Sequence, residues 1–355
     1  MKLYQIVETS AKNNDAGTKA TQDITCIAKK NGFETVDIKM RTTKLSLAAK
    51  LQRQVGYWND WKNAYQTIET ESVVLLQNPF HYPQVTREKI LRKLKKDKKV
   101  KYISVVHDVE ELRKFRYNDY YSHEFEVMME LSDVLIVHNT KMAEFFIEKG
   151  LPEEKIVILE IFDYLQSSEC ETSPEFARQI TVAGNLDTKK CAYIGQLQQL
   201  KGIDIQLYGP NFDEKMKNYE NIHYGGSLLP DEVPQRLTKG FGLVWDGTSI
   251  DGCQGDAGQY LRYNNPHKLS LYLSSGLPVV IWSGAAEADL VKKYNVGITV
   301  DSLLKLPDQM AQLTEGDYNT MRNNTKTLAQ KLKHGYYAEQ ALKKALCIIK
   351  KNETI

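Results

Sequence analysis

Short apolar segments alternate with amphipathic helical patterns along the whole chain, and this alternation constrains the fold more than any other feature. The apolar segments are rich in β-branched residues, as the buried strands of parallel sheets are. The expected strands are residues 2–7, 34–38, 73–77, 102–107, 134–138, 156–159, 181–183, 203–208, 222–224, 241–245, 278–282 and 297–300. The pattern predicts an α/β protein made of two doubly wound domains, each a parallel sheet covered by helices.

The chain has 355 residues, which is more than one small core needs and enough for two domains. Residues 166–174 (QSSECETSP) have the polar composition of a linker. We therefore place one domain at residues 1–165 and a second at residues 175–335.

Charge and cysteine content exclude several classes of protein. Lys+Arg 47 against Asp+Glu 45 gives a net charge of only +2, so a nucleic-acid partner is not expected. Five scattered cysteines without a CxxC pair indicate reduced thiols in a cytoplasmic protein, and we find neither a signal peptide nor a membrane-spanning segment. Residues 87–101 predict a strongly basic helix. Its charges can form a solvated face, the reading we favour, or a peripheral contact with an anionic membrane or an acidic partner.

Residues 260–281 (YLRYNNPHKLSLYLSSGLPVVI) contain the clearest indication of a binding site. A polar loop leads into a short helix at 268–275, Gly276 ends that helix, and an apolar strand follows. This order presents a helix N-terminus to an anion, and His267 and Lys268 lie where the anion would bind. The sequence points to a nucleotide diphosphate.

Ligands of parallel sheets bind beyond the carboxyl ends of the strands, so the loops at those ends were compared. Gly17 opens a helix after the first strand, without the GxGxxG of a dinucleotide site. His107 ends another strand, where it can act as an acid or base or form a buried structural hydrogen bond. Asn185 and Lys189 follow the first strand of the second domain, and they form either a phosphate-binding loop or an ordinary glycine turn.

Further loops of the second domain suit a flat base and a sugar. Tyr208 begins one such loop, and residues 225–228 (GGSL) form another. Asp246 can bind a sugar hydroxyl or cap the turn that follows it. There is no Walker A sequence, no HExxH and no DxD pair, so neither a metal nor a cofactor is expected.

The chain resembles the GT-B glycosyltransferases, which have two Rossmann-like domains facing each other across a cleft. The resemblance covers essentially the full length. It is closest to the bacterial family that contains the glucosyltransferase of serine-rich-repeat adhesins and related galactofuranosyltransferases. The segments that carry it are residues 183–186 (AGNL), 242–245 (GLVW), 265–270 (NPHKLS) and 272–280 (YLSSGLPVV).

This resemblance implies roles for individual residues. Lys268 is expected to contact the nucleotide diphosphate, with Asn185 and Lys189 near the phosphates. The uracil pocket is implied at Gly226, Ser227 and Leu228. Gly17 is expected close to the donor sugar, and His107 is expected to face the reacting sugar. The helix within residues 336–355 should cross back onto the first domain, and self-association is a further implication.

One departure from the pattern affects the mechanism. Many retaining GT-B enzymes have two glutamates near positions 263 and 271, and neither is present here. Tyr263, Asn264 and Ser270 are the alternatives for the ribose contact.

The leading hypothesis is a retaining, metal-independent transfer of glucose from UDP-glucose to a GlcNAc-modified protein. The alternatives are a galactofuranosyl or hexosyl transferase of cell-surface polysaccharide synthesis and a non-catalytic partner of another glycosyltransferase.

Overall fold

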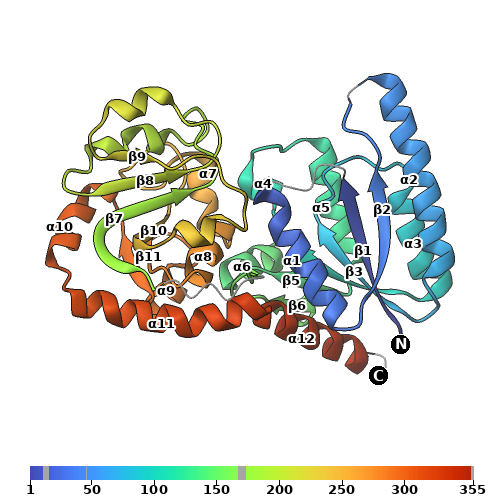
Figure 1. The fold of residues 1–355 in the computed structure, drawn as a ribbon. Helices are drawn as coiled ribbons and strands as arrows, with labels where there is room; N and C mark the ends of the chain where they lie inside the picture. The colour runs from blue at the N-terminus through green and yellow to red at the C-terminus, as the bar shows by residue number, and fades with distance from the viewer. Residues whose placement is uncertain (11–15, 45, 167–172, 353–355) are drawn as a thin grey trace.

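The computed structural model describes residues 1–10, 16–44, 46–166 and 173–352. These residues form two α/β halves lying side by side, joined along one side by the last two helices (Figure 1). Residues 11–15, between the first strand and the helix that contains Gly17, and most of the expected linker, 167–172, lie outside the described residues.

The first half is built on a six-stranded parallel sheet with strand order β2-β1-β3-β4-β5-β6. Its strands are β1 (Leu3–Ser10), β2 (Glu34–Met40), β3 (Val73–Asn78), β4 (Lys101–Val106), β5 (Val134–Val137) and β6 (Ile156–Ile158). The chain order reverses between β1 and β3, which is the topological switch point of this sheet.

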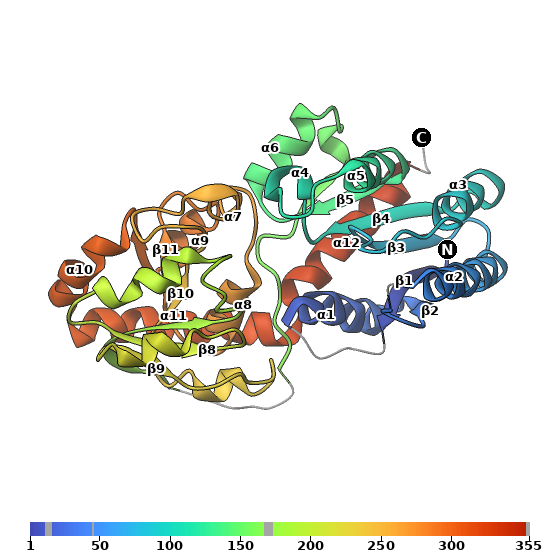
Figure 2. The same ribbon diagram turned by 90° about the horizontal axis from the view of Figure 1, so that it is seen from above.

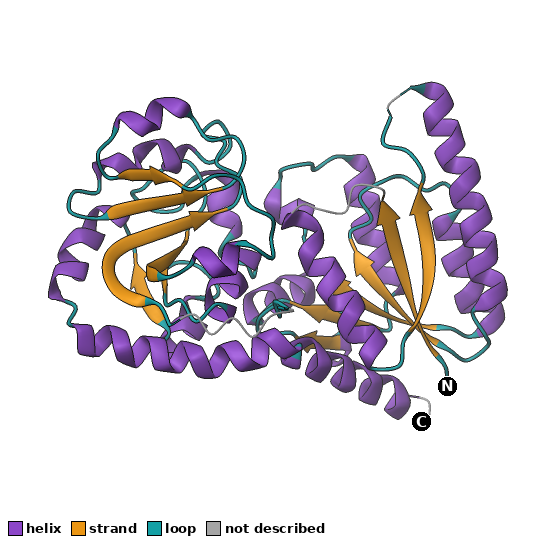
Figure 3. Ribbon diagram, in the orientation of Figure 1, coloured by secondary structure: helices purple, strands orange, loops and turns teal. Residues whose placement is uncertain are grey.

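Helices cover both faces of this sheet (Figures 2 and 3). They are α1 (Ala16–Lys30), α2 (Leu47–Thr67), α3 (Arg87–Lys98), α4 (Glu110–Arg113), α5 (Asp119–Leu131) and α6 (Thr140–Glu148), with a 3₁₀ turn η1 (Glu153–Lys155). Adjacent strand residues pack on opposite sides: Val73 and Leu75 belong to the core under α1, whereas Val74 and Leu76 pack toward α2 and α3. This double burial explains the continuous apolar runs in the sequence.

The second half repeats the architecture with strand order β12-β11-β10-β7-β8-β9. Its strands are β7 (Glu175–Ala183), β8 (Asp204–Tyr208), β9 (Ile222–Tyr224), β10 (Lys239–Val244), β11 (Val279–Trp282) and β12 (Gly297–Val300). Its helices are η2 (Ala192–Gln199), η3 (Glu214–Asn218), η4 (Val233–Arg236), α7 (Gly255–Tyr260), α8 (His267–Ser274), α9 (Ala288–Tyr294), η5 (Leu303–Lys305), α10 (Leu306–Gln312) and α11 (Glu315–His334). The switch point lies between β7 and β10, as in a Rossmann sheet. The predicted fold of two parallel-sheet domains is confirmed.

The last helix, α12 (Tyr336–Asn352), packs on the first half against α1, β5 and β6. Gly335 separates it from α11 with a φ of 81°, the left-handed conformation that glycine adopts without strain. The Asp163 carboxylate accepts hydrogen bonds from the backbone N–H groups of Tyr337 (3.2 Å) and Ala338 (2.7 Å) at the start of α12. The helix and this cap tie the two halves together.

Two sequence expectations are corrected by the structure. The helix expected over residues 87–101 ends at Lys98, because Lys99 takes a left-handed conformation (φ 54°) and Lys101 begins β4. The strand expected at 181–183 begins earlier, at Glu175.

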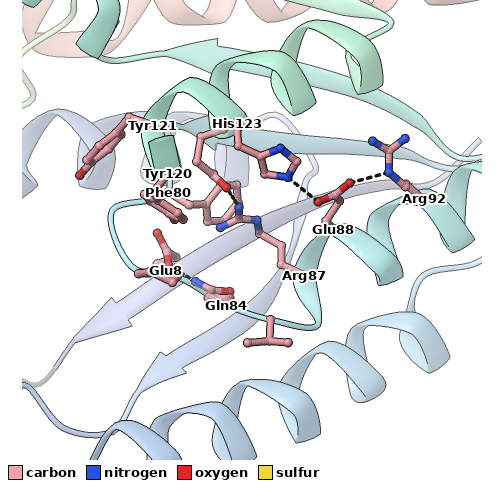
Figure 4. Close-up of polar contacts among 12 residues, drawn as sticks. Glu8, Phe80, Gln84, Arg87, Glu88, Arg92, Tyr120, Tyr121 and His123 are labelled. Carbon is pink, nitrogen blue, oxygen red and sulfur yellow. Dashed lines mark hydrogen bonds and ion pairs between the residues drawn. The ribbon is translucent and has the colours of Figure 1, made fainter. Parts of the chain in front are cut away.

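Several basic side chains of α3 are engaged within the protein. Arg87 pairs with Glu124, Arg92 with Glu130 and, as Figure 4 shows, with Glu88, and Lys95 pairs with Asp133. Part of the charge expected for a membrane surface is thus neutralised locally, which favours the solvated-face reading. In the described part of the chain, no helix has the length and apolar character needed to span a bilayer.

Candidate active site

A cavity of about 670 Å³ lies between the carboxyl edge of the second sheet and the first half. This volume suits a nucleotide-sized ligand. Its walls come from both halves, with Lys19 and Tyr164 on one side and the following residues on the other: Ala183, Gly184, Asn185, Tyr208, Gly209, Pro210, Asn211, Ser227, Leu228, Pro230, Val233, His267, Lys268 and Leu271.

The cavity lies at the switch point of the second sheet, where β7 and β10 diverge. Gly184 and Asn185 follow β7, and Trp245 and Asp246 follow β10. Lys268 bridges this opening: its Nζ donates a hydrogen bond to the carbonyl oxygen of Trp245 at 2.8 Å and lies 3.8 Å from the Asp246 carboxylate.

Lys268 is the second residue of α8, and Pro266 is the N-cap of that helix. A cation at a helix N-terminus is unfavourable, because the first-turn N–H groups already carry partial positive charge. The arrangement concentrates positive potential at one point of the cavity wall, and an anionic ligand at that point would stabilise it.

A second ammonium group reaches the cavity from the first half. Lys19, on α1, donates hydrogen bonds to the Asp23 carboxylate (2.5 Å) and the Leu165 carbonyl (2.7 Å), and its Nζ lies 4.8 Å from the centre of the Tyr164 ring. Burial raises the pKa of Asp23 to about 6, against the opposing effect of Lys19. Two facing domains thus each direct one lysine at the same space.

His267 precedes Lys268 at the start of α8 and packs on Tyr164, the ring that Lys19 also contacts. Its ring is 5.2 Å from that of Tyr164, and its Nε2 is buried with no partner among the described residues. Burial, and then the charge of Lys19, lower the pKa of His267 to about 4. The imidazole is therefore neutral at physiological pH.

The part of the cavity wall that comes from the loops after β8 and β9 is more apolar and shaped by glycines. Tyr208, Pro210 and Leu228 line it. Gly209 has a φ of 141°, and a Cβ at this position would lie 1.7 Å from the Gly184 carbonyl oxygen, so the two loops touch through backbone alone. A planar base fits against these apolar residues.

The structure brings six of the predicted binding residues together in the cavity wall. They are Asn185, Tyr208, Ser227, Leu228, His267 and Lys268. Asn185 is held in place, because its Oδ1 accepts hydrogen bonds from the Asp187 N–H and from Asn211 Nδ2. Gly17 lies in the first turn of α1, two residues before Lys19.

Other predicted residues lie outside that wall. The Lys189 side chain is exposed and not among the lining residues, and Gly226 contributes a backbone hydrogen bond to Gly209. The Oδ1 of Asp246 accepts the Gly247 N–H, so this residue caps its own turn while Oδ2 faces Lys268.

The three residues considered for a ribose contact are also placed elsewhere. Tyr263 lines a separate cavity of about 540 Å³ beside α6 and α9. Asn264 and Ser270 each have a buried side-chain oxygen without a partner in the described chain, and the Ser270 side chain is fully buried. None of the three lines the cavity that contains Lys268.

His107 follows β4 behind the cavity, stacked on Phe162 with ring centroids 5.4 Å apart. The Gln77 amide donates through Nε2 to α1, so its Oε1 accepts from His107 Nε2 at 2.7 Å. Burial, together with the charges of neighbouring histidines, lowers the pKa of His107 to about 3. A neutral His107 can accept a hydrogen bond through Nδ1 but is not a proton donor poised near pH 7.

Lys19 and Tyr164 are the cavity residues that come from the first half, and neither was among the binding residues predicted from the sequence. Lys19 lies near the N-terminus of α1, where a cation is unfavourable, as Lys268 does on α8. This placement is the sequence feature from which Lys19 could have been predicted to bind an anion. The described residues contain no group of three or more His, Cys, Asp or Glu side chains arranged to hold a metal ion.

The fold matches solved glycosyltransferases over nearly its full length. It is similar to Anabaena Alr3699/HepE, solved with UDP and glucose (TM-score 0.61, 11% identity, 98% of this chain and 99% of that one). It is also similar to the lipopolysaccharide outer core galactosyltransferase WaaB (TM-score 0.62, 12% identity, 99% and 100%). Two parallel-sheet domains of this topology define the GT-B fold.

The chain belongs to the Glucosyltransferase 3-like family: residues 3–161 match its N-terminal domain and residues 180–345 its C-terminal domain. It is 30% identical to the β-1,6-galactofuranosyltransferase WbbI of Escherichia coli K12, over 97% of this chain and 98% of that one. It is 26% identical to Glucosyltransferase 3 of Streptococcus gordonii, over 91% of this chain and 92% of that one. The protein is therefore a hexosyltransferase, as its family relatives indicate.

Proposed function

We propose that the enzyme binds a UDP-sugar in the cavity between its domains and transfers the hexose to a glycosylated acceptor with retention of configuration. The observation that carries this proposal is the convergence of Lys19 and Lys268, from opposite domains, on one cavity. A diphosphate between the two ammonium groups would be contacted from both sides. The apolar end, at Tyr208 and Leu228, would hold the base.

In this reaction the protein has to stabilise the leaving group, which is the nucleoside diphosphate. As the glycosidic bond to the diphosphate breaks, negative charge grows on the departing oxygen, and fixed cations beside it lower the barrier. Lys268, Lys19 and the first-turn N–H groups of α8 would supply that charge, so we propose turnover without a metal ion. With no carboxylate nucleophile among the cavity-lining residues, attack from the face of the departing phosphate is the mechanism we favour.

The first candidate reaction is transfer of glucose from UDP-glucose to a GlcNAc-modified protein of the serine-rich-repeat adhesin type. It is supported by the full-length match to Glucosyltransferase 3. The second candidate is galactofuranosyl transfer in polysaccharide synthesis, and the higher identity to WbbI favours it. Both candidates use the same cavity and differ in the sugar beyond the diphosphate.

A donor screen tests the proposal. Purified protein would be incubated with UDP-glucose, UDP-galactofuranose, UDP-galactose and GDP-glucose, with and without EDTA, while UDP or GDP release is measured. We expect release from one UDP-sugar, unchanged by EDTA, and none from GDP-glucose. An enzyme inactive with every donor and acceptor, yet bound to another glycosyltransferase, would overturn the proposal in favour of a non-catalytic partner.

A further inference from the structure

Helix α8 holds the ends of both strands that diverge at the switch point of the second sheet. Lys268, its second residue, donates a hydrogen bond to the Trp245 carbonyl oxygen directly after β10. Tyr272 lies four residues further along α8, on the same side of the helix. Its hydroxyl oxygen accepts a hydrogen bond from the backbone N–H of Ala183, the last residue of β7, at 2.8 Å. One helix thus fixes the two strand ends on either side of the donor cavity.

The hydrogen bond between Tyr272 and Ala183 takes the place of a strand contact. The pairing of β7 with β10 ends at Thr181, opposite Gly242, where the two strands separate. Ala183 is 8% exposed, and a buried backbone N–H without an acceptor destabilises a fold. The Tyr272 hydroxyl supplies this acceptor, so the end of β7 is held in place after its ladder with β10 has stopped.

Gly242 is the residue that allows Tyr272 to reach β7. The tyrosine is fully buried, and a Cβ added at Gly242 would lie 2.1 Å from its Cγ atom. The ring therefore packs directly on the backbone of β10, with its hydroxyl beyond that strand at the end of β7. A side chain at position 242 would displace the ring and move the hydroxyl away from Ala183.

The loop that follows Ala183 presents one open backbone donor to the cavity. The N–H groups of Gly184 and Leu186 donate to carbonyl oxygens at the end of β8 and in the loop after it, each at 2.9 Å. The N–H of Asn185, between them, has no acceptor among the residues that the structure describes. Asn185 lines the same cavity as Lys268. A backbone N–H and an ammonium group in one cavity wall suit the oxygens of a phosphate.

We propose that Tyr272 is a positioning residue of the donor site, whose hydroxyl fixes the loop after β7 so that the Asn185 N–H and the Lys268 ammonium group bind the same diphosphate. This inference rests on the proposed function, because it assigns the diphosphate to this part of the cavity. Tyr272 acts through the loop: it is fully buried and is not among the residues that line the cavity.

The test compares Tyr272→Phe with Tyr318→Phe in the full-length protein. Each change removes one hydroxyl and keeps the ring. Tyr318 is a matched control, because it is fully buried, its hydroxyl donates to the Gly240 carbonyl oxygen of β10 at 2.8 Å, and it does not line the cavity. The readouts are UDP affinity by calorimetry, donor KM and kcat from UDP release, melting temperature, and amide hydrogen exchange of residues 181–186 without ligand.

We expect Tyr272→Phe to bind UDP at least about 5-fold more weakly, the loss of one well-oriented hydrogen bond, and to raise the donor KM by a similar factor. Its kcat should stay within about twofold, because the loop contacts the diphosphate both before and during bond breaking. Exchange within residues 181–186 should be about 10-fold faster or more, since the end of β7 opens locally. Tyr318→Phe should change the melting temperature alone.

Wild-type UDP affinity in Tyr272→Phe, or an equal loss of affinity in both variants, would overturn the inference. Loss of the fold in Tyr272→Phe beside a folded Tyr318→Phe would overturn it as well, because it would mark a role in the core. A wild type that binds neither UDP nor inorganic pyrophosphate would refute the proposed function. The exchange measurement needs no ligand, so in that case faster exchange in Tyr272→Phe alone would still support the hold of Tyr272 on the loop, and unchanged exchange would contradict it.

Discussion

His138 Nδ1 accepts a hydrogen bond from the backbone N–H of Asn265 at 2.9 Å. The other ring nitrogen, Nε2, donates to the carbonyl oxygen of Val106 at 2.9 Å. This pair of bonds requires the neutral imidazole and joins β5 of the first domain to the segment before α8. Lys268 follows Asn265 by three residues, so the histidine positions the loop that presents the donor-binding lysine.

The neutral state of His138 predicts a pH dependence of stability. Burial lowers its pKa to about 4, below its usual value of 6.5, so the unfolded chain binds a proton that the folded protein excludes. The contribution of His138 is therefore present above about pH 6.5 and is lost as the pH falls toward 4, by about 1.4 kcal/mol per pH unit.

Chemical denaturation of the wild type and His138→Gln at pH 7.5, 6 and 5 measures this contribution. The difference between the two proteins is the relevant quantity, because buried carboxylates with raised pKa values, such as Glu287, change stability in the opposite sense. The stability advantage of the wild type should shrink as the pH falls. A constant difference across the three pH values would contradict the neutral-imidazole assignment.

Lys19 gives a prediction about cooperation between the domains. Lys19→Met removes the ammonium but keeps most of the aliphatic stem, and we expect UDP affinity to fall about 10-fold, as for the loss of one charge-assisted contact. Lys29→Met, at the last turn of the same helix, is the control. Isothermal titration with UDP distinguishes them, and equal affinities in both variants would show that α1 does not contribute to the donor site.

Gly209 gives a prediction about the cavity floor. Gly209→Ala would place a Cβ 1.7 Å from the Gly184 carbonyl oxygen, so the loops after β7 and β8 must separate. Gly202→Ala is the matched control, because Gly202 also has a positive φ (74°) but has no atom within 4 Å of its added Cβ.

We expect Gly202→Ala to cost about 1 kcal/mol, the strain of the left-handed conformation, and Gly209→Ala to cost more and to weaken UDP binding. Denaturant unfolding and UDP titration provide both readouts. If the two variants were equally stable and bound UDP equally well, the close contact between the loops would not shape the cavity.

The sequence predicted those parts of the fold whose signals are local. The bounds of α8 and β11 were predicted to within about one residue from Pro266, Gly276 and the apolar run that follows. Buried parallel strands can be recognised in a sequence because they are continuous apolar runs. The end of α3 was missed because lysines continue past it. The left-handed turn at Lys99 depends on β4 joining the sheet, which no neighbouring residue signals.

The site residues that follow strands of the second sheet could be predicted from the sequence. The site residues that the first domain contributes could not, because their position depends on how the two domains pack. Lys268 and Asn185 follow strands of one sheet, so the carboxyl-edge rule brought them together. Lys19 lines the cavity because the first domain packs against the second, and the position of one domain on another is not a local property of the sequence. Tyr263 points to a different cavity because the chain turns between it and α8, and a residue count does not reveal that turn.

The central claim is that Lys268 holds the diphosphate of a UDP-sugar, and UDP titration of Lys268→Ala tests it most directly. We expect UDP to bind the wild type in the presence of EDTA and to bind Lys268→Ala at least about 10-fold more weakly, with donor turnover reduced in parallel. Circular dichroism would verify that the variant is folded. Equal UDP affinity and equal turnover in the two proteins would contradict the account.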